Sequence, residues 1–169
     1  MGVANLDLII KAWDTAFWEY TLAFGGLADE NVWRRPHPRL LSIGEIAGHV
    51  AYYEAVRFTG PGPDLDPDLE LVPTKSPLID RRFTYYLKSI DEPVDLGLGA
   101  AEVLSEATRV HQAAREALMR EERDSTGLIP GFKDATWGAT LEYQIFHLAY
   151  HTGQMYSVRH MFGDTPEDN

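Results

Sequence analysis

The sequence predicts an all-α fold with one hydrophobic core. Apolar residues recur at spacings of three and four along five segments, which is typical of the buried faces of amphipathic helices. There is no internal repeat and no convincing run of strand residues. The chain has 169 residues, of which 44% are hydrophobic and 11% aromatic, so residues 1–169 are long enough to form a single domain with a sizeable core.

The first two helices are predicted over residues 5–24 and from about residue 42 to residue 58. Gly25 and Gly26 end the first helix. Ser42 and Glu45 fit a capping box at the start of the second, where each side chain satisfies a backbone amide of the first turn. The two apolar faces consist of Leu6, Ile9, Ile10, Trp13, Phe17, Tyr20 and Phe24, and of Ile43, Ile46, Val50, Tyr53 and Val56.

Residues 59–77 are predicted to be a long connection without helix or central strand, because they are too rich in proline for either. Such a connection is unusual in a compact domain. Extended at roughly 3.3 Å per residue, it could span the length of a bundle, so that the next helix starts parallel to the previous one. Its prolines are Pro61, Pro63, Pro67, Pro73 and Pro77.

Three further helices are predicted over residues 78–91, 100–121 and 136–162. The second of these is rich in alanine, which has the highest helix propensity. Thr136 or Asp134 is expected to cap the last helix, and Gly163 to end it. The apolar positions are Ile79, Phe83, Tyr86, Leu87 and Ile90, then Val103, Leu104, Ala107, Val110, Ala114, Ala117 and Leu118, and finally Leu148, Met155, Val158 and Phe162.

Composition excludes several classes of function. The net charge of −11 repels phosphate backbones, so we expect no nucleic-acid partner. The absence of cysteine excludes disulfides, iron–sulfur clusters and a thiol nucleophile from the protein itself. No stretch of eighteen apolar residues predicts a membrane span, and the N-terminus lacks the features of a signal peptide. We therefore expect a cytoplasmic protein with no membrane partner.

His147 and His151, four residues apart in the last predicted helix, are candidate metal ligands. Residues at this spacing lie about 40° apart around a helix, so both imidazoles can reach one divalent cation. His49 lies in the apolar face of the second predicted helix. Histidines in a core-facing stripe are costly unless they are paired or bound, and three imidazoles around one cation leave a coordination position open for chemistry.

Spacing alone leaves a structural alternative open, in which His147 or His151 is a core histidine bonded to Tyr53 or to a backbone carbonyl. His111, on the apolar stripe of the fourth predicted helix, is a reserve ligand, although we interpret it as a core histidine. His37 and His160 are interpreted as non-ligands, because the first lies between two prolines and the second near a helix end.

No catalytic acid or base is assigned from the sequence. Glu54 is roughly 140° around the helix from His49 and Glu45 belongs to a cap, so both are interpreted as surface carboxylates. Gln154 lies one turn beyond His151 and could bond a metal-bound water or a substrate, or could be a core amide. Tyr53 and Tyr143 could each place a hydroxyl near the ion, but we interpret both as core aromatic residues.

Four segments together resemble the DinB/YfiT-like superfamily. SIGEIAGHVAYYE over residues 42–54 and HLAYHTGQ over residues 147–154 carry the resemblance, supported by WRRP over residues 33–36 and VRHMFGDTP over residues 158–166. The segments occur in the family's order and cover essentially the whole chain. The pairing of HxxxHxGQ with the upstream Gly-His is the most specific part.

The resemblance implies a four-helix bundle in up-down-down-up order, with the proline-rich crossover and with or without a short extra helix. It also implies a divalent ion, usually zinc or nickel, held by His49, His147 and His151. Several members with known activity are metal-dependent transferases that use low-molecular-weight thiols such as bacillithiol or mycothiol. Homodimers are common in the family.

The leading hypothesis is therefore a metal-dependent enzyme that acts on a small molecule, most simply a transferase that uses a low-molecular-weight thiol as co-substrate. A metal-dependent hydrolase is the rival within the enzyme class. The alternatives are a non-catalytic metal-binding or stress-associated dimeric bundle, and a bundle whose histidines are only structural. The choice of metal among zinc, nickel, iron and manganese stays open, because imidazole suits several of them.

Overall fold

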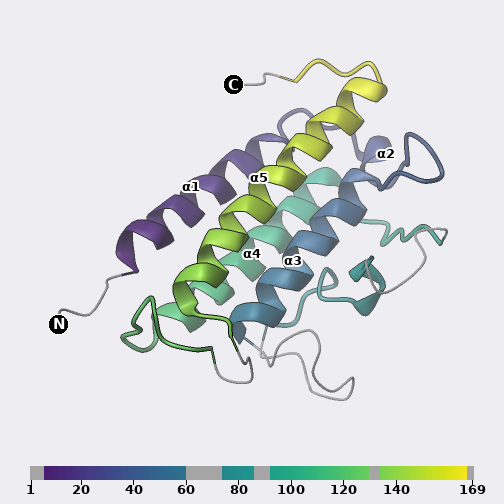
Figure 1. Cartoon of the computed structure of the whole chain (residues 1–169). Coiled ribbons are helices and arrows are strands. Elements are labelled where there is room, and N and C mark those ends of the chain that lie inside the picture. Colours follow the sequence, from purple (N-terminus) through teal and green to yellow (C-terminus); the bar gives the residue numbers. More distant parts are fainter. Residues whose placement is uncertain (1–5, 60–73, 86–91, 130–133, 167–169) are drawn as a thin grey trace.

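The computed structural model describes residues 6–59, 74–85, 92–129 and 134–166, and within them four long helices form a bundle (Figure 1). A short helix and a single 3₁₀ turn accompany the bundle, and the described residues contain no strand beyond one isolated bridge between Leu128 and Thr136. The elements are α1 (Asp7–Leu22), α2 (Asp29–Val32), α3 (Ile43–Thr59), η1 (Arg81–Phe83), α4 (Ala100–Met119) and α5 (Trp137–Met161).

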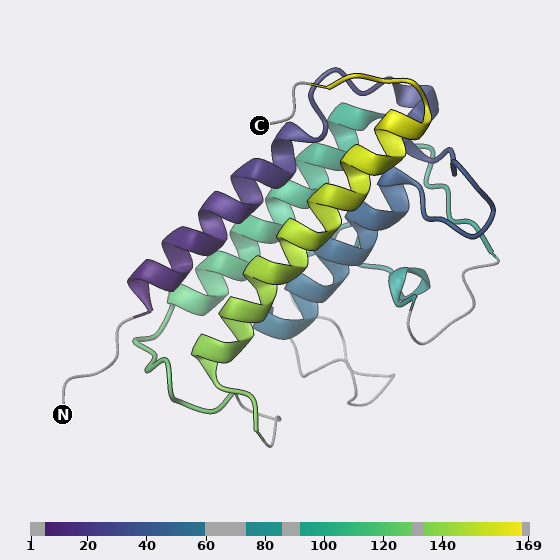
Figure 2. The same cartoon turned by 45° about the horizontal axis from the view of Figure 1, so that its top comes forward.

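The four long helices run up, down, down and up, as predicted (Figures 1 and 2). Arg159 near the end of α5 donates to the carbonyl of Ala23 at 2.9 Å, so α1 and α5 end together. Trp33, which lies before α3, donates its indole N–H to the carbonyl of Leu98 before α4 at 2.8 Å, so α3 and α4 begin together. The parallel pairs α1–α5 and α3–α4 pack side by side, and α3 also packs against the antiparallel α5.

Local signals in the sequence set the helix ends that were predicted. Ser42 N–H donates to Glu45 Oε2 at 2.8 Å and Glu45 N–H donates to Ser42 Oγ at 3.2 Å, which confirms the capping box. Thr136 Oγ1 accepts from the N–H of Ala139 at 3.2 Å and caps α5. Gly163 follows α5 with φ of 78°, a conformation that few residues other than glycine adopt readily.

The helix predicted over residues 78–91 is wrong for its described part. Residues 78–85 contain only the 3₁₀ turn η1, because Asp80 accepts from both the backbone and the side chain of Arg82, at 2.8 and 2.9 Å. Such local bonding competes with a regular helix. Residues 86–91, and residues 60–73 of the predicted crossover, lie outside the described residues.

The positions of α3 and α4 agree with the role that we predicted for the proline-rich connection, which is to span the length of the bundle. Because α3 ends at the opposite end of the bundle from the start of α4, the connection between them has to cover the length of the bundle (Figure 1). None of the described helices combines the length and the hydropathy that a bilayer-spanning segment needs.

Candidate metal centre

His49, His147 and His151 lie together between α3 and α5. The Nε2 atom of His147 is 3.1 Å from Nε2 of His49 and 3.1 Å from Nε2 of His151. All three residues are buried, and their ligand atoms lie within 4.8 Å of one another, so the group could hold a metal ion. The structure thus brings together the three residues that the sequence singled out.

Two of the three imidazoles are held by hydrogen bonds from the ring nitrogen that faces away from the group. His49 Nδ1 lies 2.8 Å from the carbonyl oxygen of Phe83, and His151 Nδ1 lies 2.7 Å from Oε1 of Gln154. Both partners are acceptors only, so each Nδ1 carries the proton and each Nε2 presents a lone pair. This arrangement is typical of metal-binding histidines, whose outer nitrogen is fixed by a carbonyl or carboxylate.

The third imidazole cannot satisfy both neighbours by itself. His147 Nε2 stands at hydrogen-bond distance from two lone pairs but can carry at most one proton. At least one of the two nitrogen–nitrogen contacts therefore has no proton between its atoms. A cation at the centre would accept all three lone pairs, so the donor set fits a metal ion better than it fits three mutually bonded histidines.

Burial keeps these histidines in the neutral form that a metal needs. Desolvation lowers the pKa of His147 to about 2, helped by His151, His49 and the positive charge of Arg57. Desolvation, together with His49, lowers the pKa of His151 to about 4. The pKa of His49 is also lowered, mainly by burial, although its bond to Phe83 acts in the opposite direction. At neutral pH the three imidazoles are therefore uncharged, and no second proton competes with a metal ion for them.

The metal-free protein is expected to lose stability as the pH falls below about 6.5. In the unfolded chain a histidine takes up a proton near pH 6.5, whereas in the folded chain His151 stays neutral to about pH 4 and His147 to about pH 2. The unfolded state then binds more protons, which lowers the free energy of unfolding by at most about 1.4 kcal/mol per pH unit for each histidine. Thermal unfolding in EDTA between pH 7.5 and 5 measures this, and an unchanged midpoint would contradict it.

Aromatic rings and one arginine surround the histidines. The ring of Tyr53 packs edge-on against His49 at 4.8 Å, and Tyr143 stacks on His147 at 5.9 Å. The guanidinium of Arg57 lies 4.3 Å from the centre of the Tyr143 ring. The core interpretation is confirmed for Tyr53, which is buried, but it is wrong for Tyr143, which is 46% exposed. Tyr143 lies on the face of α5 that borders the site, not on the face that enters the core.

Gln154 acts on a histidine directly. Its Oε1 accepts from His151 Nδ1, while its amide nitrogen donates to the hydroxyl of Tyr150 at 3.2 Å. The structure therefore gives Gln154 the role of orienting His151. A bond from Gln154 to a metal-bound water or to a substrate, which the sequence left open, would compete with this contact.

The surface interpretation of Glu45 and Glu54 is wrong, because both are 0% exposed. Besides its cap, Glu45 accepts from Arg35 Nε at 2.8 Å and from the N–H of Val94 at 3.0 Å. Glu54 faces away from the three histidines, as its angle on the helix predicted, and points into the core between α1 and α4. Each carboxylate is thus occupied elsewhere and neither serves the site as a base.

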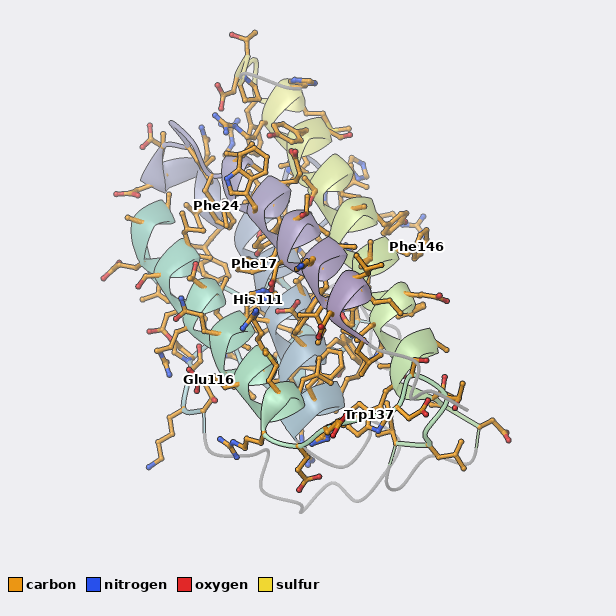
Figure 3. The ribbon with its side chains drawn as sticks, turned by 90° about the vertical axis from the view of Figure 1, so that its left-hand side faces the viewer. Phe17, Phe24, His111, Glu116, Trp137 and Phe146 are labelled. Carbon is orange, nitrogen blue, oxygen red and sulfur yellow. The ribbon has the colours of Figure 1, made fainter. Side chains whose placement is uncertain are left out.

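The remaining histidines lie outside the group. His111 is a core histidine, which confirms the interpretation made from the sequence. Its Nδ1 lies 3.2 Å from Oε1 of Glu54, and its ring stacks on Phe17 at 3.8 Å. Figure 3 shows His111 between α4 and α1, next to Phe17. His37 Nδ1 accepts from the N–H of Arg39, and His160 is exposed. None of the three joins the candidate centre.

Two contributors to the site were not found from the sequence. The carbonyl of Phe83 comes from a predicted helix that does not form, and a backbone acceptor leaves no mark in a side-chain pattern. Arg57 follows His49 by eight residues and lies about 80° from it around the helix. This spacing puts Arg57 near the site, but it gives no sign that its guanidinium stacks on Tyr143.

Comparison with known proteins gives one match. A family model described as the DinB superfamily matches residues 13–155, which include all three histidines. Neither the curated proteins nor the solved structures yield a match.

Proposed function

The chain belongs to the DinB superfamily, and from this and the site we propose that it is a metal-dependent enzyme whose divalent ion is held by His49, His147 and His151. The observation that carries the proposal is the convergence of three Nε2 atoms, two of them fixed as lone-pair donors by Phe83 and Gln154. Three protein ligands leave a position for a substrate group. The family resemblance favours zinc or nickel.

We further propose that the reaction is a transfer that uses a low-molecular-weight thiol as co-substrate. A divalent cation in the site would lower the pKa of a bound thiol, so that it is a thiolate near neutral pH. The chain has no cysteine, so the thiol has to come from outside. The sulfur forms a bond to an electrophilic carbon, the leaving group departs with its bonding electrons, and the thiol proton passes to solvent.

The residues around the histidines support binding more directly than proton transfer. Arg57 contributes a positive charge beside the site, which would favour an anionic nucleophile such as a thiolate. Glu45 and Glu54 are engaged elsewhere, so the proposal needs no general base from α3. A co-substrate that ionises on binding fits this arrangement better than a hydrolysis that needs a protein base.

The test is a panel of low-molecular-weight thiols with a generic aromatic electrophile, using the zinc- and nickel-loaded full chain. We expect a rate that depends on both thiol and metal with at least one thiol and falls to background after EDTA. Metal binding without a rate for any thiol would leave a non-catalytic metal-binding bundle. Turnover of an ester without thiol would indicate the hydrolase instead.

A homodimer is a separate proposal, supported by large apolar side chains that α5 exposes. Phe146 is 60% exposed and Tyr150 is 53% exposed, and Figure 3 shows Phe146 projecting outward from α5. Contiguous exposed apolar surface of this kind is typical of protein contacts. Light scattering of the full chain would give the mass that decides it.

A further inference from the structure

A cavity of about 250 Å³ lies between the segment before α3 and the C-terminal half of α5. Its walls are mainly apolar, and three polar residues interrupt them: Arg39, Gln154 and Ser157. The apolar wall consists of Leu40, Leu41, Ile46, Val158 and Met161.

The cavity is next to the three histidines along the groove between α3 and α5. Ile46 lies three residues, about one turn, before His49 on α3, and Gln154 lies three residues after His151 on α5. Because α3 and α5 are antiparallel, both steps lead in the same direction. Gln154 lines the cavity and also holds His151, with Oε1 2.7 Å from Nδ1. Since Nδ1 faces away from the other two histidines, Gln154 and the imidazole of His151 lie between the cavity and the three Nε2 atoms.

Arg39 is the positive charge of this cavity. Within the part of the chain that the structure describes, no carboxylate pairs with its guanidinium, and its backbone N–H donates to His37 Nδ1 at 3.1 Å. The neighbouring Arg35 differs, because it is bound to Glu45. In a chain of net charge −11, a cation at the mouth of an apolar cavity selects for an anion with an apolar body.

We propose that the cavity binds the apolar part of the substrate, that Arg39 pairs with a carboxylate or similar anionic group on it, and that its reacting end extends past Gln154 to the histidines. This inference rests on the proposed function and adds to it the substrate class, a small amphipathic organic acid. The volume lies below the roughly 300–1,000 Å³ of sites for drug-sized ligands, so the apolar part is short.

Octanoate and octanamide test this, because they are nearly equal in shape and differ in charge. They are titrated into the ¹⁵N-labelled, zinc-loaded full chain, and the amide shifts of residues 153–161 report the place of binding. A partly exposed ion pair contributes up to about 1 kcal/mol, so we expect octanoate to bind about threefold to fivefold more tightly than octanamide. Arg39→Gln should remove that preference, and Ser157→Phe, at the exposed edge of the cavity, should weaken both ligands.

The control is Arg120→Gln, which removes another exposed positive charge, directly after α4 and so at the other end of the bundle. It should leave the preference for octanoate intact. Equal binding of the two ligands overturns the inference. A preference for octanoate that survives Arg39→Gln also overturns it, and would place the carboxylate on the metal instead. The metal content of the same samples tests the proposed function separately. If the cavity binds octanoate but the protein holds no metal, the inference about the cavity is supported and the proposed function is not.

Discussion

His147→Ala is expected to reduce bound zinc or nickel from about one ion per chain to background. In the proposed site His147 is the middle ligand, with its Nε2 3.1 Å from Nε2 of both His49 and His151, so its removal would leave two ligands, too few for a stable site. Loss of a residue that only supports a ligand costs about 10–100-fold in affinity, and loss of the ligand itself should cost more. Elemental analysis after dialysis, followed by titration of the metal-free protein, measures the change.

His160→Ala is the matched control, because His160 lies on the same helix and is exposed. It should keep the full metal content. The circular dichroism of His147→Ala should remain that of a helical bundle, since the side chain lies at the edge of the core. Equal metal content in wild type, His147→Ala and His160→Ala would mean that the three histidines do not form a metal site.

Much of this centre could be predicted because its position depends on sequence patterns within single helices. The spacing of His147 and His151 fixes their relative direction once α5 is known to be a helix, and the apolar periodicity of α5 supplies that knowledge. The capping box of Ser42 and Glu45 similarly fixes where α3 starts, and hence that His49 faces inward. The order of the helices could be inferred only through the resemblance to a family.

The missing parts depend on contacts between distant segments. Glu54 was placed correctly by angle, away from His49, and then wrongly assigned to the surface. Periodicity shows which residues share a helix face, but it does not show whether a second face is also buried, and α3 is buried on two. The hydrogen-bond partners that stabilise the buried carboxylate of Glu54 are Trp13 and His111, which lie 41 and 57 residues away in the sequence. The helix predicted over residues 78–91 failed for a different, local reason, because the bonds from Arg82 to Asp80 overrode an apolar pattern.

Glu54 is the centre of a polar cluster in the hydrophobic core. Its Oε1 accepts from the indole N–H of Trp13 at 2.9 Å and lies 3.2 Å from Nδ1 of His111. His111 stacks on Phe17, and its other nitrogen is 3.6 Å from Asp14. Burial, and then the negative charge of Glu54, raise the pKa of Tyr20 nearby. The cluster thus connects α1, α3 and α4 through one carboxylate.

Glu54→Ala is expected to lower the free energy of unfolding by about 3 kcal/mol or more without removing the metal. The substitution leaves the buried donors of Trp13 and His111 without their acceptor, at about 1–3 kcal/mol each, and opens a cavity. Breaking a buried charged contact from one side has a similar cost. For a chain of this size such a loss lowers the thermal midpoint by about 6–12 °C. Thermal and urea unfolding measure it, and metal analysis of the same samples should show full loading.

Further variants identify the cause of that loss. Glu54→Gln keeps the volume and an acceptor for Trp13, so it should cost less than Glu54→Ala, and the difference measures the acceptor and the cavity together. Glu116→Ala removes an exposed carboxylate on α4 (Figure 3) and should change stability little. In a double-mutant cycle, Glu54→Ala with His111→Ala should cost clearly less than the sum of the single substitutions, because each already leaves the other residue without its partner. Additive costs would show that the two residues stabilise the core independently.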